Sequence, residues 1–318
     1  MSARTAFLLR RLALVIPSLL ALSIFVFALI RLVPGDPART MLGFRATPKT
    51  VATVRHDLRL DESLPAQYVH WLGGVLHGDL GRDYVSGAPV GHLIAQALPV
   101  TLELVVLAML VALLIGVPLG VLAASGSRIA ERLSSGFVVA GIAMPDFWLG
   151  TLLVLVFAAA IGILPPVGWV PISGGIGQNL RYLVLPVMAL AIGEGAYILR
   201  TTRGAMLDTL GRPFVAFLHA KGLSYRRIVF RHALRNAAVP IITVVGIQFG
   251  VLLGASIVIE TIFGLPGVAR LVVTALEQRN YTVVQGGVLT IAALFVVVNL
   301  LTDLAYGWLD PQVGERGA

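Results

Sequence analysis

The chain has 318 residues, of which 57% are hydrophobic and only 13% charged, whereas a soluble domain carries about a quarter charged residues, so the composition predicts a membrane protein. Cysteine is absent, which excludes disulfides, thiol nucleophiles and cysteine-ligated metal sites. The net charge of +8 does not predict nucleic-acid binding, because eight of the 24 basic residues lie in one stretch between apolar segments, Arg200 to Arg235, as in a cytoplasmic loop.

Six apolar runs are long enough to cross a bilayer. A hydrocarbon core of about 30 Å requires about 20 apolar residues in a helix, and lipid offers no hydrogen-bond partner to backbone outside a helix. In chain order the predicted spans are residues 12–30, 104–124, 136–164, 182–199, 237–259 and 283–302. The third run is interrupted by Met144-Pro145-Asp146-Phe147. We therefore expect an all-α polytopic membrane protein with six transmembrane helices.

The distribution of basic residues predicts that both termini are cytoplasmic. Basic residues are concentrated before the first span, after the second and after the fourth, whereas the loops after the third and fifth spans carry few or balanced charges. The first apolar run has 19 residues and is followed by Leu-Val-Pro-Gly-Asp instead of a cleavage site, so it is read as a retained helix. We expect residues 1–103 to form this helix and a long extracytoplasmic loop, and residues 104–318 to form a core of five spans.

Small residues recur at spacing four on two of the spans. Helices associate in lipid where small residues let their backbones approach closely. Gly116 and Gly120 lie on such a row in the second span, and Gly246, Gly250 and Gly254 form another in the fifth. These rows predict either packing within the chain or a seam with a second, related subunit, and the fifth span favours the seam.

Three polar residues inside the spans require an explanation, because a charge at the centre of a membrane helix costs about 2.5–3.5 kcal/mol on insertion scales. Asp146 follows Met144 and Pro145, where the helix is expected to kink, and it either lines a pathway or caps the half-helix after the kink. Glu194 either lines the pathway or, as we favour, pairs with a nearby arginine such as Arg200. Gln248 lies among the glycines of the fifth span and is a further pathway candidate.

The basic loop between the fourth and fifth spans, residues 200–236, predicts two short helices. Pro213 suits the first turn of one helix, Gly222 its C-terminal end, and Ser224 the N-cap of a second helix. Phe214, Phe217 and Leu218 share one apolar face that would be exposed unless it docks into a groove of a partner. In the second helix, α-helical spacing places three arginines on one stripe, namely Arg227, Arg231 and Arg235.

This loop carries a family resemblance. The run Ala220-Lys221-Gly222-Leu223-Ser224, followed by Arg231-His232-Ala233-Leu234-Arg235-Asn236-Ala237 and Pro240, resembles the coupling loop of ABC importer permeases, and specifically the first permease subunit of the dipeptide/oligopeptide/nickel group. Further landmarks extend over nearly the whole chain: Pro34-Gly35-Asp36-Pro37, Gly78-Asp79-Leu80-Gly81, the segments 99–104 and 144–148, Glu260 to Gly267, and Leu309-Asp310-Pro311.

The resemblance implies a MetI-like type I importer fold and a set of partners. It implies that the chain is a multi-pass protein of the cell (inner) membrane of a prokaryote. The implied partners are a second homologous permease subunit, two ATP-binding subunits that dock on the loop helix, and an extracytoplasmic substrate-binding protein. The chain itself lacks the glycine-rich Gly-Lys-Ser/Thr signature of a nucleotide site, so ATP and Mg²⁺ are expected on the partner ATPase, and no catalytic residue is expected here. We expect di- or oligopeptides as cargo, with nickel or a metal chelate as the alternative.

Two other classes of membrane protein fit the sequence less well. A stand-alone secondary transporter would be expected to have paired broken helices in its two halves, whereas only the third span is clearly broken. An intramembrane protease would need histidines inside the spans, whereas all six histidines lie in predicted loops. His70 and His77 share the extracytoplasmic loop, but two solvated histidines do not by themselves predict a metal site.

Overall fold

The computed structural model describes residues 3–31, 36–57, 59–126 and 128–309. Within these ranges the secondary structure is helical apart from one isolated antiparallel bridge between Arg82 and Pro89. The chain forms two compact units. The first unit comprises residues 1–11, 102–265 and 297–318, and the second unit comprises residues 12–101 and 266–296.

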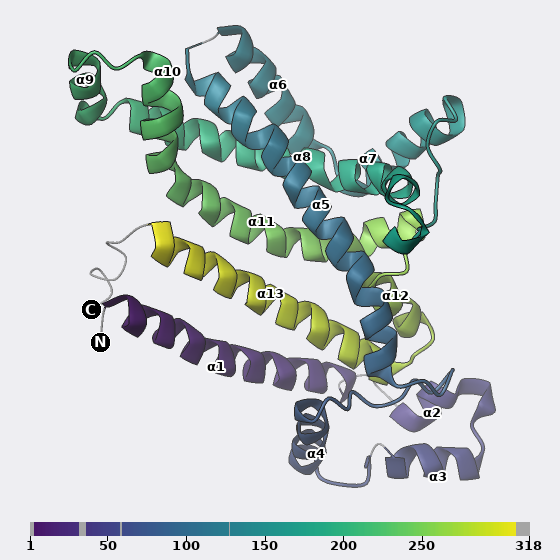
Figure 1. Ribbon diagram of the computed structural model, residues 1–318. Helices are drawn as coiled ribbons and strands as arrows, with labels where there is room; N and C mark the ends of the chain where they lie inside the picture. The colour runs from purple at the N-terminus through teal and green to yellow at the C-terminus, as the bar shows by residue number, and fades with distance from the viewer. Residues whose placement is uncertain (1–2, 32–35, 58, 127, 310–318) are drawn as a thin grey trace. The chain divides into compact units, whose positions relative to one another are not determined.

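The helices are joined by short turns and by two longer loops, residues 77–89 and 161–171 (Figure 1). In chain order they are α1 (Ala3–Arg31), α2 (Pro37–Leu42), the 3₁₀ turn η1 (Gly43–Arg45), α3 (Pro48–Asp57), α4 (Leu64–Leu76), α5 (Val90–Ala124), α6 (Arg128–Ala143), α7 (Asp146–Leu153), the π-helical η2 (Val154–Ala160), the 3₁₀ turn η3 (Ile172–Gly174), α8 (Ile176–Leu210), α9 (Pro213–Ala220), α10 (Tyr225–Arg227), the π-helical η4 (Ile228–Ala233), α11 (Leu234–Phe263), α12 (Val268–Glu277) and α13 (Tyr281–Leu309).

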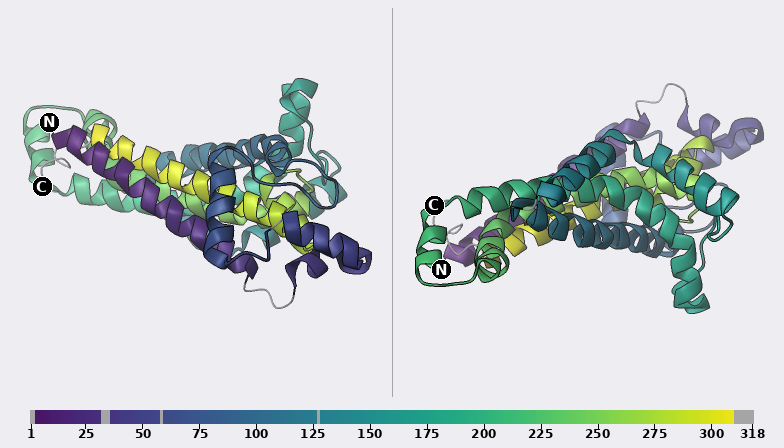
Figure 2. Two further views of the ribbon diagram at one scale, coloured as in Figure 1. Left: turned by 90° about the horizontal axis from the view of Figure 1, so that it is seen from below. Right: turned by 90° about the horizontal axis from the view of Figure 1, so that it is seen from above.

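Helix α8 is at the centre of the first unit. It packs against α11, α6 and α7, and its side chains Leu190, Ile198 and Met206 are fully or almost fully buried. Where α8 ends at Leu210, the short helix α9 lies beyond it in every view (Figures 1 and 2). The first unit therefore combines an apolar helix bundle with the basic loop that the sequence predicts.

The predicted spans are confirmed as apolar helices, but several of their boundaries were wrong. Four helices are long and apolar enough to cross a membrane, and the pair α6 and α7–η2, bent by 102°, is a fifth candidate among the described residues. Helix α5 begins at Val90, inside the predicted first loop, and α8 runs to Leu210, past the predicted loop start at Arg200. Helix α1 contains a shorter apolar stretch, Ala13–Ala28, so the count of six stays a prediction.

These differences arise because a hydropathy reading stops at the last apolar residue, whereas a helix continues as long as its backbone hydrogen bonds can be made. Arg128 and Arg132, predicted to lie in a loop, are in α6. Pro240, predicted near the start of the fifth span, lies inside α11. Because Pro240 lies beyond the first turn, it removes one backbone hydrogen bond from the helix, which nevertheless continues to Phe263.

The second unit has its own hydrophobic cluster. Val90 and Ile94 of α5 pack there with Val268 of α12 and Val283 of α13. Gly286 allows this approach, because a Cβ at that position would lie 2.7 Å from Val90 Cγ1. The cluster fixes the start of α5 against the α12–α13 turn.

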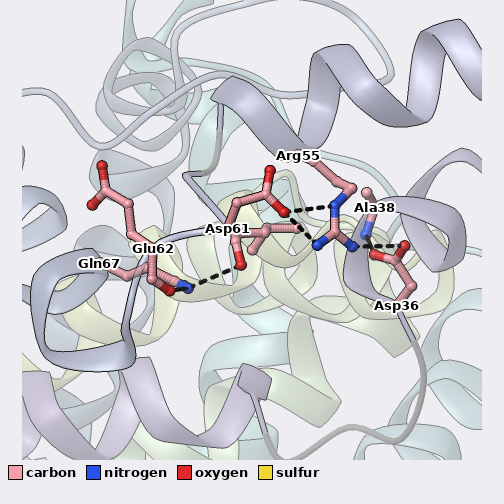
Figure 3. A network of polar contacts seen from close by, with 7 residues as sticks. Asp36, Ala38, Arg55, Asp61, Glu62 and Gln67 are labelled. Carbon is pink, nitrogen blue, oxygen red and sulfur yellow. Dashed lines mark hydrogen bonds and ion pairs between the residues drawn. The ribbon is translucent and has the colours of Figure 1, made fainter.

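A charge network organises the short helices α2 and α3 of the second unit (Figure 3). Arg55 donates to Asp61 Oδ1 at 2.5 Å and to Asp36 Oδ2 at 3.1 Å. Asp36 in turn accepts a hydrogen bond from the backbone N–H of Ala38 and caps α2. Nearby, Gln67 donates to the backbone oxygen of Glu62 at 2.9 Å. One arginine thus connects the α2 cap to the segment before α4.

Candidate functional site

The basic loop forms the two short helical segments that its turn residues predict. Pro213 occupies the first turn of α9, and Gly222 adopts φ = 79° directly after the helix, in the region that favours glycine. Ser224 stands at the N-cap position of α10, but its side chain makes no capping hydrogen bond, contrary to the prediction. The positions of the helix ends were therefore predicted correctly, and the capping bond was not.

The apolar face of α9 is divided between burial and exposure. Val215, which the sequence analysis did not single out, is 7% exposed and anchors the helix. Phe217 is 57% exposed, whereas Phe214 and Leu218 are half-buried. Lys221 Nζ lies 4.5 Å from the centre of the Phe217 ring. The loop thus presents an exposed aromatic side chain beside a cation, with Val215 holding the helix in place.

The connection between α9 and α11 packs on a buried hydrophobic cluster, which we call the base of the loop. Val229 and Ala233 of η4 pack with Met206 of α8 and Val121 of α5 in one hydrophobic cluster. The rings of His219 and Tyr225 stack with their centres 6.0 Å apart across the link between α9 and α10. The remaining predicted loop residues lie around this base: Ala220, Arg231, Arg235 and Asn236 are exposed, and Leu223 and His232 are half-buried. Asn236 Nδ2 donates to the backbone oxygen of His232 at 2.8 Å.

The predicted arginine stripe assumed an α-helix, and this assumption was wrong. Residues Ile228–Ala233 form a π-helical segment, in which hydrogen bonds join i to i+5 and side chains four residues apart no longer align. Arg227, Arg231 and Arg235 are nevertheless all exposed. The basic surface is present, but its pattern does not follow α-helical spacing.

The predicted break in the third span separates α6 from α7. Pro145, with ψ = 140°, is the N-cap residue of α7, and Asp146 occupies the first turn, so Asp146 is not the capping residue that one interpretation required. A carboxylate is nevertheless favoured there by the helix dipole. Asp146 Oδ1 lies 3.2 Å from where a Cβ on Gly193 would be, and Met144 is half-buried beside the break. The break therefore faces α8 at Gly193.

The next residue of α8, Glu194, forms a buried polar pair with α11. Gln248 Nε2 donates to Glu194 Oε2 at 2.5 Å, and the two residues are 7% and 5% exposed. No ion pair joins Glu194 to Arg200 among the described residues, so the pairing that we favoured from the sequence was wrong. Asp146, Glu194 and Gln248, which come from three spans, are thereby brought to the same region of the first unit.

The two glycine rows have different surroundings. A Cβ on Gly116 would lie 2.7 Å from the backbone oxygen of Gly195, and one on Gly120 would lie 2.6 Å from Thr202 Cβ, so both glycines pack against α8. On α11, a Cβ on Gly246 would lie 2.9 Å from Thr302 Cβ, whereas Gly254 has nothing within 4 Å and is exposed. Gly250 is partly exposed between them.

One buried charged residue escaped the sequence analysis. Glu260 is fully buried in the last helical turns of α11, where we had predicted a loop. The signal that could have shown this is Gly264, four residues after Glu260, because glycine readily ends a helix. In the structure Gly264 has a left-handed φ of 66° and follows the last residue of α11. The fifth span therefore carries a buried charged residue in addition to the buried polar residues Gln248 and Ser256.

The histidines of the second unit have protein partners. His70 Nδ1 is 2.8 Å from Glu62 Oε2, and His77 Nδ1 is 2.7 Å from the backbone oxygen of Gly73. Among the residues that the structure describes, no three histidine, aspartate or glutamate side chains gather as metal ligands.

Comparisons with known proteins agree with this architecture. The family model described as "Binding-protein-dependent transport system inner membrane component" matches residues 116–315, and its N-terminal counterpart matches residues 4–105. The "Probable peptide ABC transporter permease protein y4tP" of Sinorhizobium fredii is 41% identical over 309 residues, covering 96% of this chain and 98% of that protein. The "Dipeptide transport system permease protein DppB" of Escherichia coli K12 is 38% identical over 335 residues, covering 98% and 99%.

The fold is shared with a solved transporter. A chain of the MetNI methionine ABC transporter in an inward-facing conformation superposes with a TM-score of 0.57 at 19% identity, covering 69% of this chain and 96% of that chain. The apolar helices, the broken third span and the projecting basic loop thus define a MetI-like, multi-pass membrane permease. This chain belongs to the binding-protein-dependent transport system inner membrane component family of ABC transporter permeases. Its members are permease subunits of ABC transporters and are not themselves enzymes.

Proposed function

We propose that this chain is one of two permease subunits of an ATP-driven importer and forms half of its translocation path for di- or oligopeptides. The cargo is supported by relatives named for peptide and dipeptide transport. Nickel and metal chelates are the alternative cargo within the same family, and among the described residues no cluster of possible metal ligands favours them. In this proposal, an extracytoplasmic binding protein delivers the peptide, and two ATP-binding subunits hold ATP and Mg²⁺.

The observation that carries the proposal is the exposed aromatic residue on α9. Phe217 is 57% exposed, although Val215 on the same helix is buried and the base beneath is packed. Exposed apolar side chains on a fixed short helix are suited to insertion into a groove of a partner protein. We infer that Phe217, with Phe214 and Leu218 beside it, docks into the ATP-binding subunit and receives its motion.

A charge substitution tests this docking. Phe217→Glu places a carboxylate in the proposed interface, and the loss of an aromatic anchor typically costs about 2 kcal/mol or more of binding free energy. We expect co-purification of the ATP-binding subunit and ATP-dependent dipeptide uptake to fall at least tenfold. Phe44→Glu is the matched control, because Phe44 is fully exposed in the predicted extracytoplasmic loop. If association and uptake both survive Phe217→Glu, the docking assignment is wrong.

A further inference from the structure

The second unit contains a cavity of about 870 Å³ that the permease mechanism does not use. It lies between the end of α4, the segment 77–84 and the first turns of α13. Its volume is within the range of about 300–1,000 Å³ that is typical of small-molecule sites. We propose that this cavity binds a short zwitterionic peptide on the permease itself, an inference that rests on the peptide cargo of the proposed function.

Two of the charged residues that line the cavity, Asp79 and Arg82, have opposite signs and no ion-pair partner among the described residues. Arg82 makes a hydrogen bond to the backbone oxygen of Gly87 at 3.2 Å, and Asp79 accepts one from the backbone N–H of Gly81 at 2.8 Å. Within the described part of the chain, no ion pair engages either side chain. A peptide with a free α-carboxylate and a free α-ammonium group is complementary to this pair, because Arg82 would bind the first and Asp79 the second.

The other walls suit the body of a peptide. The aromatic side chains of Trp71, Tyr84 and Tyr281 line the cavity and offer apolar area to a side chain of the ligand. Burial raises the pKa of Tyr84 to about 12, so its hydroxyl stays protonated. Gln285, which is 6% exposed, also lines the cavity, and its Nε2 has no hydrogen-bond partner among the described residues. A peptide carbonyl would provide the acceptor that this amide lacks.

The wall that carries Asp79 and Arg82 is fixed in place. Asp83 is buried and accepts hydrogen bonds from Val85 N at 2.8 Å, from Ser86 Oγ at 2.5 Å and from Asn280 Nδ2. Gly81, with φ = 86°, lies directly against Thr282, since a Cβ there would be 2.6 Å from Thr282 Cγ2. The backbone of this segment is thus held against Asn280 and Thr282 before any ligand arrives, which lowers the entropic cost of binding.

The test is direct binding of radiolabelled L-alanyl-L-alanine to the purified permease–ATPase complex without its binding protein. We expect saturable binding that weakens at least tenfold in Arg82→Gln and in Asp79→Asn. Arg39→Gln is the matched control, because Arg39 is exposed on α2 and does not line the cavity. N-acetyl-alanyl-alanine amide, which lacks both terminal charges, should not compete with the dipeptide.

Amide hydrogen exchange provides a second readout that does not depend on a variant folding well. The dipeptide should slow exchange in residues 78–84 and 281–285. Absence of saturable binding, or binding that is equal in both variants and wild type, overturns the inference, as does protection by the binding protein but not by the dipeptide. ATP-driven uptake of the dipeptide with the binding protein present is measured separately: uptake without this binding refutes the site alone, whereas a complex that binds the dipeptide and cannot transport it refutes the proposed function.

Discussion

Replacing Gly116 by alanine tests how closely α5 and α8 approach. The added methyl carbon would lie 2.7 Å from the backbone oxygen of Gly195 and 2.8 Å from Ile198 Cβ. Neither atom can move by a rotamer change, because one belongs to the backbone of α8 and the other is fixed to it. The two helices must therefore separate by several tenths of an ångström.

Two opposing terms determine the size of the effect. Alanine favours a helix over glycine by about 0.5–1 kcal/mol, whereas overpacking of a close-packed contact costs about 1–3 kcal/mol. We expect Gly116→Ala to lower the free energy of unfolding by about 1 kcal/mol. Gly204→Ala is the matched control, since Gly204 is in α8, is exposed and has nothing within 4 Å of its added carbon. That variant should gain about 0.5–1 kcal/mol from helix propensity alone.

The assay is unfolding in mixed detergent micelles with increasing SDS, followed by far-UV circular dichroism. The difference between the two variants isolates the packing term, because both make the same chemical change inside a helix. If Gly116→Ala is as stable as Gly204→Ala, the close approach of α5 and α8 at this glycine is incorrect.

Three further predictions concern α11 and the second unit. Gly254→Ala should leave the chain as stable as the wild type or more so, while weakening co-purification of the second permease subunit; unchanged co-purification would exclude a seam at this position. Gln248→Leu removes the hydrogen bond to Glu194 and should lower the free energy of unfolding by about 0.6–1.7 kcal/mol, which are the average and the maximum found for interhelical hydrogen bonds in membranes. The double variant with Glu194→Leu should recover most of that loss, and an additive double variant would contradict the pairing. Burial of Asp83 opposes its ionisation, but the hydrogen bonds from Ser86, Val85 and Asn280 prevail and lower its pKa. The stability contributed by Asp83 should therefore be complete above its unfolded pKa of about 3.9, and it should be lost as the pH falls through the lower pKa of the folded state. Amide exchange of residues 83–89 measures this pH dependence, which Asp83→Asn should abolish.

The sequence by itself determined those features that depend on local chemistry. Apolar runs of about 20 residues predicted the membrane helices, because only a helix satisfies its own backbone in lipid. Pro213 and Gly222 predicted the ends of α9, since one fixes a helical φ and the other adopts a positive φ without strain. The role of α9 in docking could be inferred only from resemblance and exposure, and it stays a proposal.

Only the tertiary structure decided which distant residues meet. Glu194 was expected to pair with Arg200, six residues away, but its partner is Gln248 on another helix. Glu260 was assigned to a loop, yet it is fully buried within α11. Neither the cavity of the second unit nor the π-helical segment in the basic loop has a signature in hydropathy or spacing. The physical reason is the same in each case: a buried polar group takes its hydrogen-bond partner from whichever helix packs against it, and that neighbour is set by the packing of the whole unit, not by the adjacent sequence.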